Sequence, residues 1–141
     1  MDATSGEAAV TGEAIHFADF VVGKVMGQVE TPISDEKVKA WTELYPWDAE
    51  KGGEAPWSMA TALMMEAYLK VVAPRPPGNL HVNQVMRIED TAMIGEAVTI
   101  EIMCLAKHVK GVRRVVELQA TGLGADRRRL FDGLITLYWA A

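Results

Sequence analysis

The chain has 141 residues, of which 50% are hydrophobic and 23% are charged, so it is long enough for one domain with a substantial core. Its net charge of −5 excludes general affinity for nucleic acids, which requires a basic surface. The single cysteine, Cys104, excludes an internal disulfide bond and fits a reducing cytoplasm. No basic region followed by an apolar run occurs near the N-terminus, so we expect no signal peptide.

The N-terminal part of the chain carries little regular patterning. Residues 1–14 are small and polar, which predicts a disordered segment followed by a single domain over residues 15–141. Residues 16–29 mix short apolar runs with Gly23 and Gly27, which predicts an irregular first strand or an extended arm.

Two helices are predicted next, one short and one long. A short amphipathic helix is expected over residues 35–45, because Ser34 can cap its start and Pro46 ends it. The stretch 55–73, APWSMATALMMEAYLKVVA, is apolar on nearly all sides, which predicts a helix that is buried on most sides. Its length of roughly 27 Å is marginal for a bilayer. Because the charged Glu66 and Lys70 would lie inside the membrane, we expect no membrane span.

After a proline-rich break over residues 73–79, the apolar period changes from 3.6 to 2, which predicts strands. Hairpin-type turns are expected around Gly95, Gly111 and Gly122. The alternating sets run over residues 80–88, 98–107, 112–120 and 131–139. An antiparallel sheet that curls around one long helix is the hot-dog arrangement, of the α+β class. Such a sheet exposes an edge, so we expect two chains to pair edge to edge as a dimer.

The second half of the sequence resembles the MaoC-like hydratase/dehydratase family of the hot-dog superfamily. The resemblance is carried by NLHVNQVMRIEDTAMIGEAVTIEI and KHVKGVRRVVEL, while ISDEKVKAWTELY resembles the first helix of the family and EAPWSMATALMMEAYL the start of its central helix. It extends over nearly everything after Phe17. It implies an acyl-CoA or acyl-carrier thioester as substrate, no separate cofactor, with coenzyme A as part of the substrate, and a homodimer or a heterodimer with another hot-dog chain.

The catalytic loop of the family is not preserved. MaoC-like hydratases resemble one another in an Asp and a His about five residues apart, just after the first helix. Here that loop reads YPWDAEKGGE: Asp48 lies close to the aspartate position, and Gly52 or Gly53 stands where the histidine would fall. Trp57 and Ser58 occupy the place where the family often has His-Gly.

The head of the central helix is the strongest candidate for a site. Free backbone N–H groups at a helix N-terminus can polarise a thioester carbonyl, and Ser58 or Met59 would supply the amide. The hydroxyl of Ser58 could donate as well. The alternative is that Ser58 is only a helix cap.

A catalytic carboxylate is expected in the adjoining loop. A carboxylate in an apolar environment near Trp47 and Trp57 would have a raised pKa and could act as general base. Asp48 is preferred and Glu54 is a neighbour in the site; the alternative is a solvated acidic loop. His81 is the histidine with a route to a site, as a second catalytic group, against the alternative of a hydrogen-bonded structural histidine.

Other ligands are constrained by what the sequence contains. No histidines or carboxylates have metal-ligand spacing, so we expect no metal. Basic residues at the hairpins could hold the phosphates of coenzyme A or could be solvated tips. They are Lys107, Lys110, Arg113, Arg114 and Arg127 to Arg129.

Three functions remain open on these observations. The first is an acyl-CoA hydratase or dehydratase with an atypical site. The second is a thioesterase in which Asp48 or Glu54 activates water against the thioester carbonyl. The third is a non-catalytic subunit that partners a competent MaoC-like chain, which the missing histidine favours.

Overall fold

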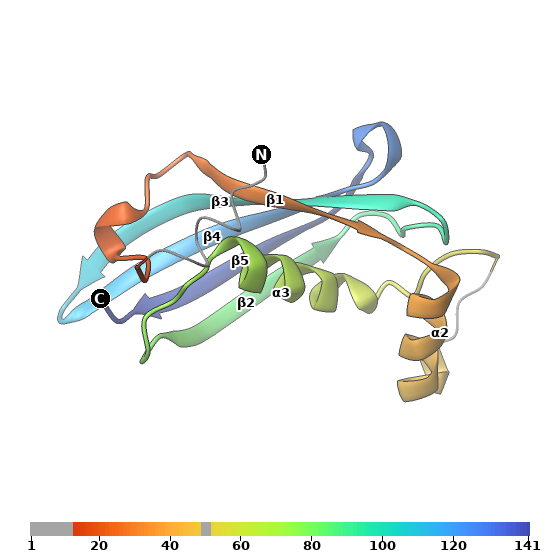
Figure 1. Ribbon diagram of the computed structural model, residues 1–141, viewed down its shortest axis with the longest axis horizontal. Helices are drawn as coiled ribbons and strands as arrows, with labels where there is room; N and C mark the ends of the chain where they lie inside the picture. Colours follow the sequence, from red (N-terminus) through yellow and green to blue (C-terminus); the bar gives the residue numbers. More distant parts are fainter. Residues whose placement is uncertain (1–12, 49–51) are drawn as a thin grey trace.

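The computed structural model describes residues 13–48 and 52–141, without the side chain of Asp48. A curved sheet lies along the molecule, one long helix crosses one of its faces, and a shorter helix stands beyond one end (Figure 1). The strands are β1 (Val25–Pro32), β2 (Leu80–Ile88), β3 (Ala97–Lys110), β4 (Arg113–Leu123) and β5 (Arg129–Trp139). The helices are α2 (Asp35–Leu44) and α3 (Met59–Val71), with short 3-10 turns η1 (Phe17–Asp19), η2 (Pro46–Asp48) and η3 (Ala125–Arg127). Residues 1–12 of the segment predicted to be disordered lie outside the described residues.

The predicted antiparallel sheet around one central helix is confirmed. The five strands lie in the order β1-β3-β4-β5-β2, and every neighbouring pair is antiparallel. The period-2 pattern acts as expected: Val98, Ile100, Ile102 and Cys104 of β3 are fully buried, while the residues between them are half-buried. The irregular strand or arm predicted over residues 16–29 corresponds in part to β1. This strand pairs with β3 and has an irregular register between Val25 and Gly27.

The prediction that turns of the hairpin type join the last four strands is wrong for one link. β2 pairs with β5 at one edge of the sheet, whereas β3 lies next to β1 near the other edge, so residues 89–96 cross between them. Alternation identifies strands but does not specify which strands pair. Gly122, expected in a turn, instead lies within β4 opposite Phe131.

The central helix is shorter and less enclosed than expected. It begins at Met59, whose N–H donates to the carbonyl of Pro56 at 3.1 Å, and its 13 residues span about 20 Å. One side packs on the sheet through Met59, Leu63, Met64, Ala67 and Tyr68, all of which are buried. On the other side Ala62 and Leu69 are exposed in the single chain. The sequence predicted a helix that is buried on most sides, but in the single chain the sheet buries only one side of α3.

The short helix α2 is confirmed, with the hydroxyl of Ser34 accepting the N–H of Lys37 at 3.1 Å. Among its side chains only Val38 is fully buried. Within the described residues, no helix is both long enough and apolar enough to cross a membrane.

Gly122 offers a test of how tightly the sheet face is packed. A Cβ there would lie 2.3 Å from Cε2 of Phe131, whose buried ring cannot move aside. Gly122→Ala should therefore lower the free energy of unfolding by about 1–3 kcal/mol, measured by urea denaturation. Gln119→Ala, on the other face of β4, should stay close to the wild type. Equal stability of Gly122→Ala and wild type would mean that the ring yields.

Candidate functional site

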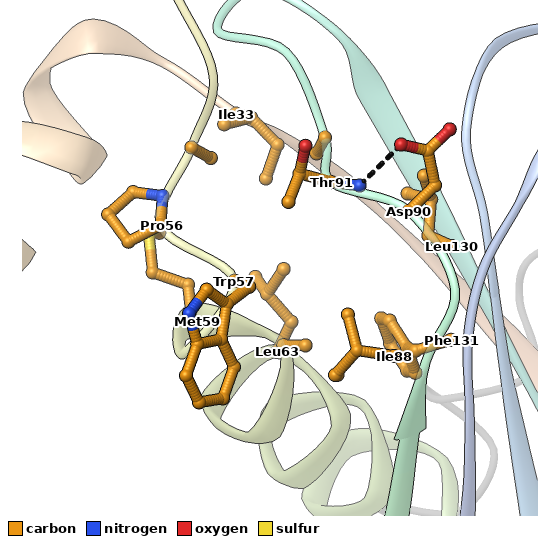
Figure 2. Close-up of a pocket in the computed structure, with 13 residues that line it drawn as sticks. Ile33, Pro56, Trp57, Met59, Leu63, Ile88, Asp90, Thr91, Leu130 and Phe131 are labelled. Carbon is orange, nitrogen blue, oxygen red and sulfur yellow. Dashed lines mark hydrogen bonds between the residues drawn. The ribbon is translucent and has the colours of Figure 1, made fainter. Parts of the chain in front are cut away.

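A pocket opens at the N-terminal end of α3. It lies between this end of the helix, the segment after β2 and the start of β5. Its enclosed volume is about 20 Å³, room for about one water molecule, within about 340 Å³ of space that includes open solvent (Figure 2). Most of its walls are apolar. They are formed by Ile33, Ala55, Pro56, Trp57, Met59, Ala60, Leu63, Ile88, Ala92, Leu130 and Phe131, with Asp90 and Thr91 as the polar members.

Two chain segments far apart in sequence are tied together to make this pocket. Residues 53–55, which precede α3, run antiparallel to residues 92–94 of the crossing segment. The N–H of Ala55 donates to the carbonyl of Ala92 at 2.8 Å, and the N–H of Ile94 donates to the carbonyl of Gly53 at 2.9 Å. This short bridge fixes the distance between the helix side and the opposite wall.

The polar groups gather on the crossing segment at the mouth. The N–H of Thr91 donates to Oδ1 of Asp90 at 2.8 Å, as Figure 2 shows. The hydroxyl of Thr91 donates to Oε2 of Glu54 at 3.0 Å. Thr91 thus connects the pocket wall to the segment that leads into α3.

Arg128 holds the crossing segment from the outside. Its guanidinium donates to Oδ2 of Asp90 at 2.5 Å, to both oxygens of Glu96 at 2.6 and 2.7 Å, and to the carbonyl of Thr91 at 3.2 Å. The side chain of Glu96 also accepts the N–H groups of Met93 at 2.9 Å and Ala125 at 2.6 Å. The crossing segment and the β4–β5 connection therefore meet at one buried carboxylate.

These contacts keep both carboxylates ionised. The hydrogen bond from Arg128 lowers the pKa of Asp90 below its usual value, and the N–H of Thr91 acts in the same direction. Burial alone would raise the pKa of Glu96, but the N–H groups of Met93 and Ala125, together with Arg128, outweigh it, so that this pKa is lowered. Neither group is therefore suited to accept a proton near neutral pH.

Several residues predicted for the site do lie around this pocket. Trp57 and Met59 line it, Trp57 with 63% of its surface exposed, and Glu54 is bonded to Thr91 on its wall. Ser58 accepts a hydrogen bond at Oγ from the indole of Trp41 at 3.1 Å. The Met59 amide is already bonded to Pro56, so it can reach a substrate carbonyl only if that turn opens.

Other predicted site residues lie elsewhere. Trp47 is 78% exposed and packs edge-on against Tyr45, with ring centroids 5.9 Å apart. Asp48 ends η2, and its side chain lies outside the described part of the structure. His81 faces Tyr68 with ring centroids 6.4 Å apart, and Tyr68 is about 13 Å along α3 from Met59. The structure does not bring His81 to the pocket within one chain.

The basic residues expected to form one patch are divided between the two ends of the sheet. Arg113 and Arg114 begin β4 and Arg127 to Arg129 follow its end, so the two groups are separated by the length of that strand, about 33 Å. At the pocket end, Arg128 is held by Asp90 and Glu96, and Arg129 contacts Asp132 at 2.5 Å. Within residues 13–48 and 52–141, no group of three potential metal ligands comes together.

Sequence reasoning missed Thr91 and Asp90, and it expected Arg128 only as one of the basic residues that could hold phosphates. The signal was the tripeptide Glu89-Asp90-Thr91 directly after an apolar strand, but only the fold shows that it faces the start of α3.

We compared the chain with known protein families, curated proteins and solved structures. No family model and no curated protein matches the sequence. The structure is similar to that of a MaoC-like dehydratase from Rhodospirillum rubrum, with a TM-score of 0.76 and 13% identity over 91% of this chain and 99% of that one. The chain has the hot-dog fold.

Two further solved structures share this hot-dog fold. The R-hydratase PhaJ1 from Pseudomonas aeruginosa matches with a TM-score of 0.73 and 16% identity over 89% of this chain and 86% of that one. The ChsH1-ChsH2 complex from Mycobacterium tuberculosis matches with a TM-score of 0.66 and 14% identity over 85% of this chain and 98% of the matched chain. Likeness at this level of identity establishes the fold alone.

The Arg128 network makes a prediction about stability and pH. The lowered carboxylate pKa values contribute stability above the unfolded-state pKa of about 4, and this contribution is lost as the pH falls through the folded-state values. Arg128→Gln should cost about 1–2 kcal/mol at pH 7 in urea unfolding, and the difference from wild type should shrink at pH 3. Arg127→Gln, which removes an exposed cation 3.5 Å from Glu101, should change little at either pH. An equal loss at both pH values for Arg128→Gln would contradict this account.

Proposed function

We propose that the protein binds the acyl group of an acyl thioester in the pocket at the head of α3, as a MaoC-like hydratase or dehydratase does. The observation that carries this proposal is the pocket itself, which has an apolar floor and a mouth with Thr91, Asp90 and the nearby Glu54. Its apolar lining suits a small apolar chain attached to a polar carrier. Because the enclosed volume of about 20 Å³ holds only about one water molecule, the walls must move apart to admit that chain. The carrier is coenzyme A or a carrier protein.

The resemblance of the sequence and the hot-dog fold both support an acyl-thioester ligand. Hydration of an α,β-unsaturated thioester is the reaction we favour. Asp48 and His81 stay as predicted catalytic residues, and the separation of His81 from the pocket means that a partner chain would have to bring a histidine there if one is needed.

A non-catalytic role in a heterodimer is the second candidate. It is favoured because no histidine is among the residues that line the pocket, and because one of the similar structures is a complex of two named proteins. A thioesterase is the third. Incubation with crotonyl-CoA separates them: loss of the enoyl absorbance without free thiol means hydration, thiol release means hydrolysis, and neither supports the subunit role.

We further propose that the chains pair through β2. This edge strand exposes three large apolar side chains, Leu80, Val82 and Val85, at 51, 45 and 55% of their surfaces, beside the polar His81, Asn83 and Arg87. The opposite edge strand, β1, exposes one such side chain, Val25, at 47%, beside the polar Gln28 and Glu30. An apolar, unpaired edge favours association with another strand, and polar edges oppose it.

The acyl site is tested by filling the pocket. Ala60 lines it and Ala62 lies on the exposed side of the same helix, so Ala60→Phe and Ala62→Phe form a matched pair. Ala60→Phe should weaken binding of butyryl-CoA at least tenfold by calorimetry, since the ring takes the space of the acyl chain, and Ala62→Phe should not. Absence of binding to the wild type would sink the proposal.

The dimer is tested by placing charge on the apolar edge. A double change, Val82→Glu with Val85→Glu, should convert a species of twice 15.4 kDa into one of 15.4 kDa in light scattering, because two charged edges cannot pair. Gln28→Glu on β1 is the control and should leave the dimer intact. A dimer that survives the double change would rule out pairing through β2.

A further inference from the structure

Glu54 and Thr91 form a carboxylate–hydroxyl pair beside the pocket: Thr91 lines it, and Glu54 adjoins it through this bond and through Ala55, the next residue, which also lines it. The hydroxyl of Thr91 points at Oε2 of Glu54, 3.0 Å away, and Thr91 is itself part of the pocket wall. Both backbones are fixed: Glu54 forms an isolated β-bridge with Met93, and the carbonyl of Thr91 accepts from Arg128. The pair is therefore held in place from both segments that build the pocket.

Glu54 differs from the other carboxylate at this mouth in its partners. Asp90 is engaged by Arg128 and by the N–H of Thr91, which stabilise its charge and make it a weak base. Among the described residues, no cation lies within ion-pair distance of Glu54, and the one hydrogen bond to its side chain comes from a neutral hydroxyl. Oε1 of Glu54 accepts no hydrogen bond from these residues, so it is the oxygen that can take a proton from water.

We propose that Glu54 is the general base of this site and that Thr91 positions its carboxylate. This assignment rests on the acyl-thioester function proposed above. In this assignment one carboxylate, on the segment that leads into α3, takes the role of the histidine that is absent from the loop YPWDAEKGGE.

The chemical step balances with water as the one co-reactant. Oε1 of Glu54 takes a proton from a water molecule while the water oxygen forms a bond to the β-carbon of the enoyl thioester. The electron pair of the carbon–carbon double bond moves toward the thioester carbonyl, which gives an enolate. The protonated Glu54 then returns the proton to the α-carbon, so that a 3-hydroxyacyl thioester leaves and the carboxylate is restored.

Thr91 contributes through the orientation of Glu54. Its hydroxyl is bonded to Oε2 and limits rotation of the carboxylate, so removal of the hydroxyl should lower kcat more than it changes KM. The other charged groups of this network are Asp90, Glu96 and Arg128, which bind one another and are unchanged by the substitution.

The test uses the intact chain with crotonyl-CoA for turnover and butyryl-CoA, which has no double bond to hydrate, for binding. Glu54→Gln should reduce hydration about 100-fold or more while butyryl-CoA binding is kept. Thr91→Val should lower kcat for hydration while butyryl-CoA binding is kept, and Thr91→Ser should restore kcat. Glu89→Gln is the matched control for loss of a carboxylate. Glu89 lies on the crossing segment with Thr91, but it contacts Arg129 at 4.0 Å and does not line the pocket.

The outcomes separate this assignment from the proposed function. Binding of butyryl-CoA without turnover of crotonyl-CoA by the wild type, or full turnover by Glu54→Gln, overturns the role of Glu54 and leaves the acyl site standing. Loss of turnover in Asp48→Asn but not in Glu54→Gln assigns the base to Asp48 and also overturns it. Failure of the wild type to bind either thioester removes both proposals.

Discussion

Packing of one side of α3 on the sheet is the interaction on which the rest of the structure depends. Met64 is fully buried between the helix and β5, and Gly133 leaves the space that its sulfur occupies, since a Cβ there would lie 2.2 Å from that atom. Gly122 leaves similar room for Phe131. The two glycines let large side chains fill the interface, and the ring of Phe131 then becomes part of the pocket floor.

The pocket arises because the chain must cross from β2 to β3 at this end of the sheet. The crossing segment cannot pair as a hairpin, so its polar groups are satisfied by Arg128, by the amides around Glu96 and by the bridge to residues 53–55. These contacts fix the segment at a distance from α3. The space that remains between the two is lined by the apolar side chains of both.

The sequence predicted the elements of the fold well, because period 3.6 and period 2 are imposed by local backbone geometry. It could not predict that β2 pairs with β5, since alternation is the same for every partner strand. For the site, Trp57, Met59 and Glu54 were found from their place at the start of α3. Thr91 was not, and Arg128 was expected only as a possible phosphate contact. The two residues are 37 and 74 residues beyond Glu54 in the chain, and only the crossing segment brings them near it. His81 was expected nearer to this site because a sequence gives no position along a strand relative to a helix.

The shallow attachment of α2 has a consequence for motion. A ten-residue helix is held to the body of the molecule by one fully buried side chain, Val38, and by the partly buried Trp41, whose indole donates to Ser58. The partly exposed Lys37–Glu66 ion pair at 3.6 Å adds little. Segments with so little buried surface open at a free energy well below that of global unfolding. Amide protons of α2 should thus exchange with solvent long before those of β3 and β4. Each such opening would break the hydrogen bond from the Trp41 indole to Ser58, the residue that precedes α3.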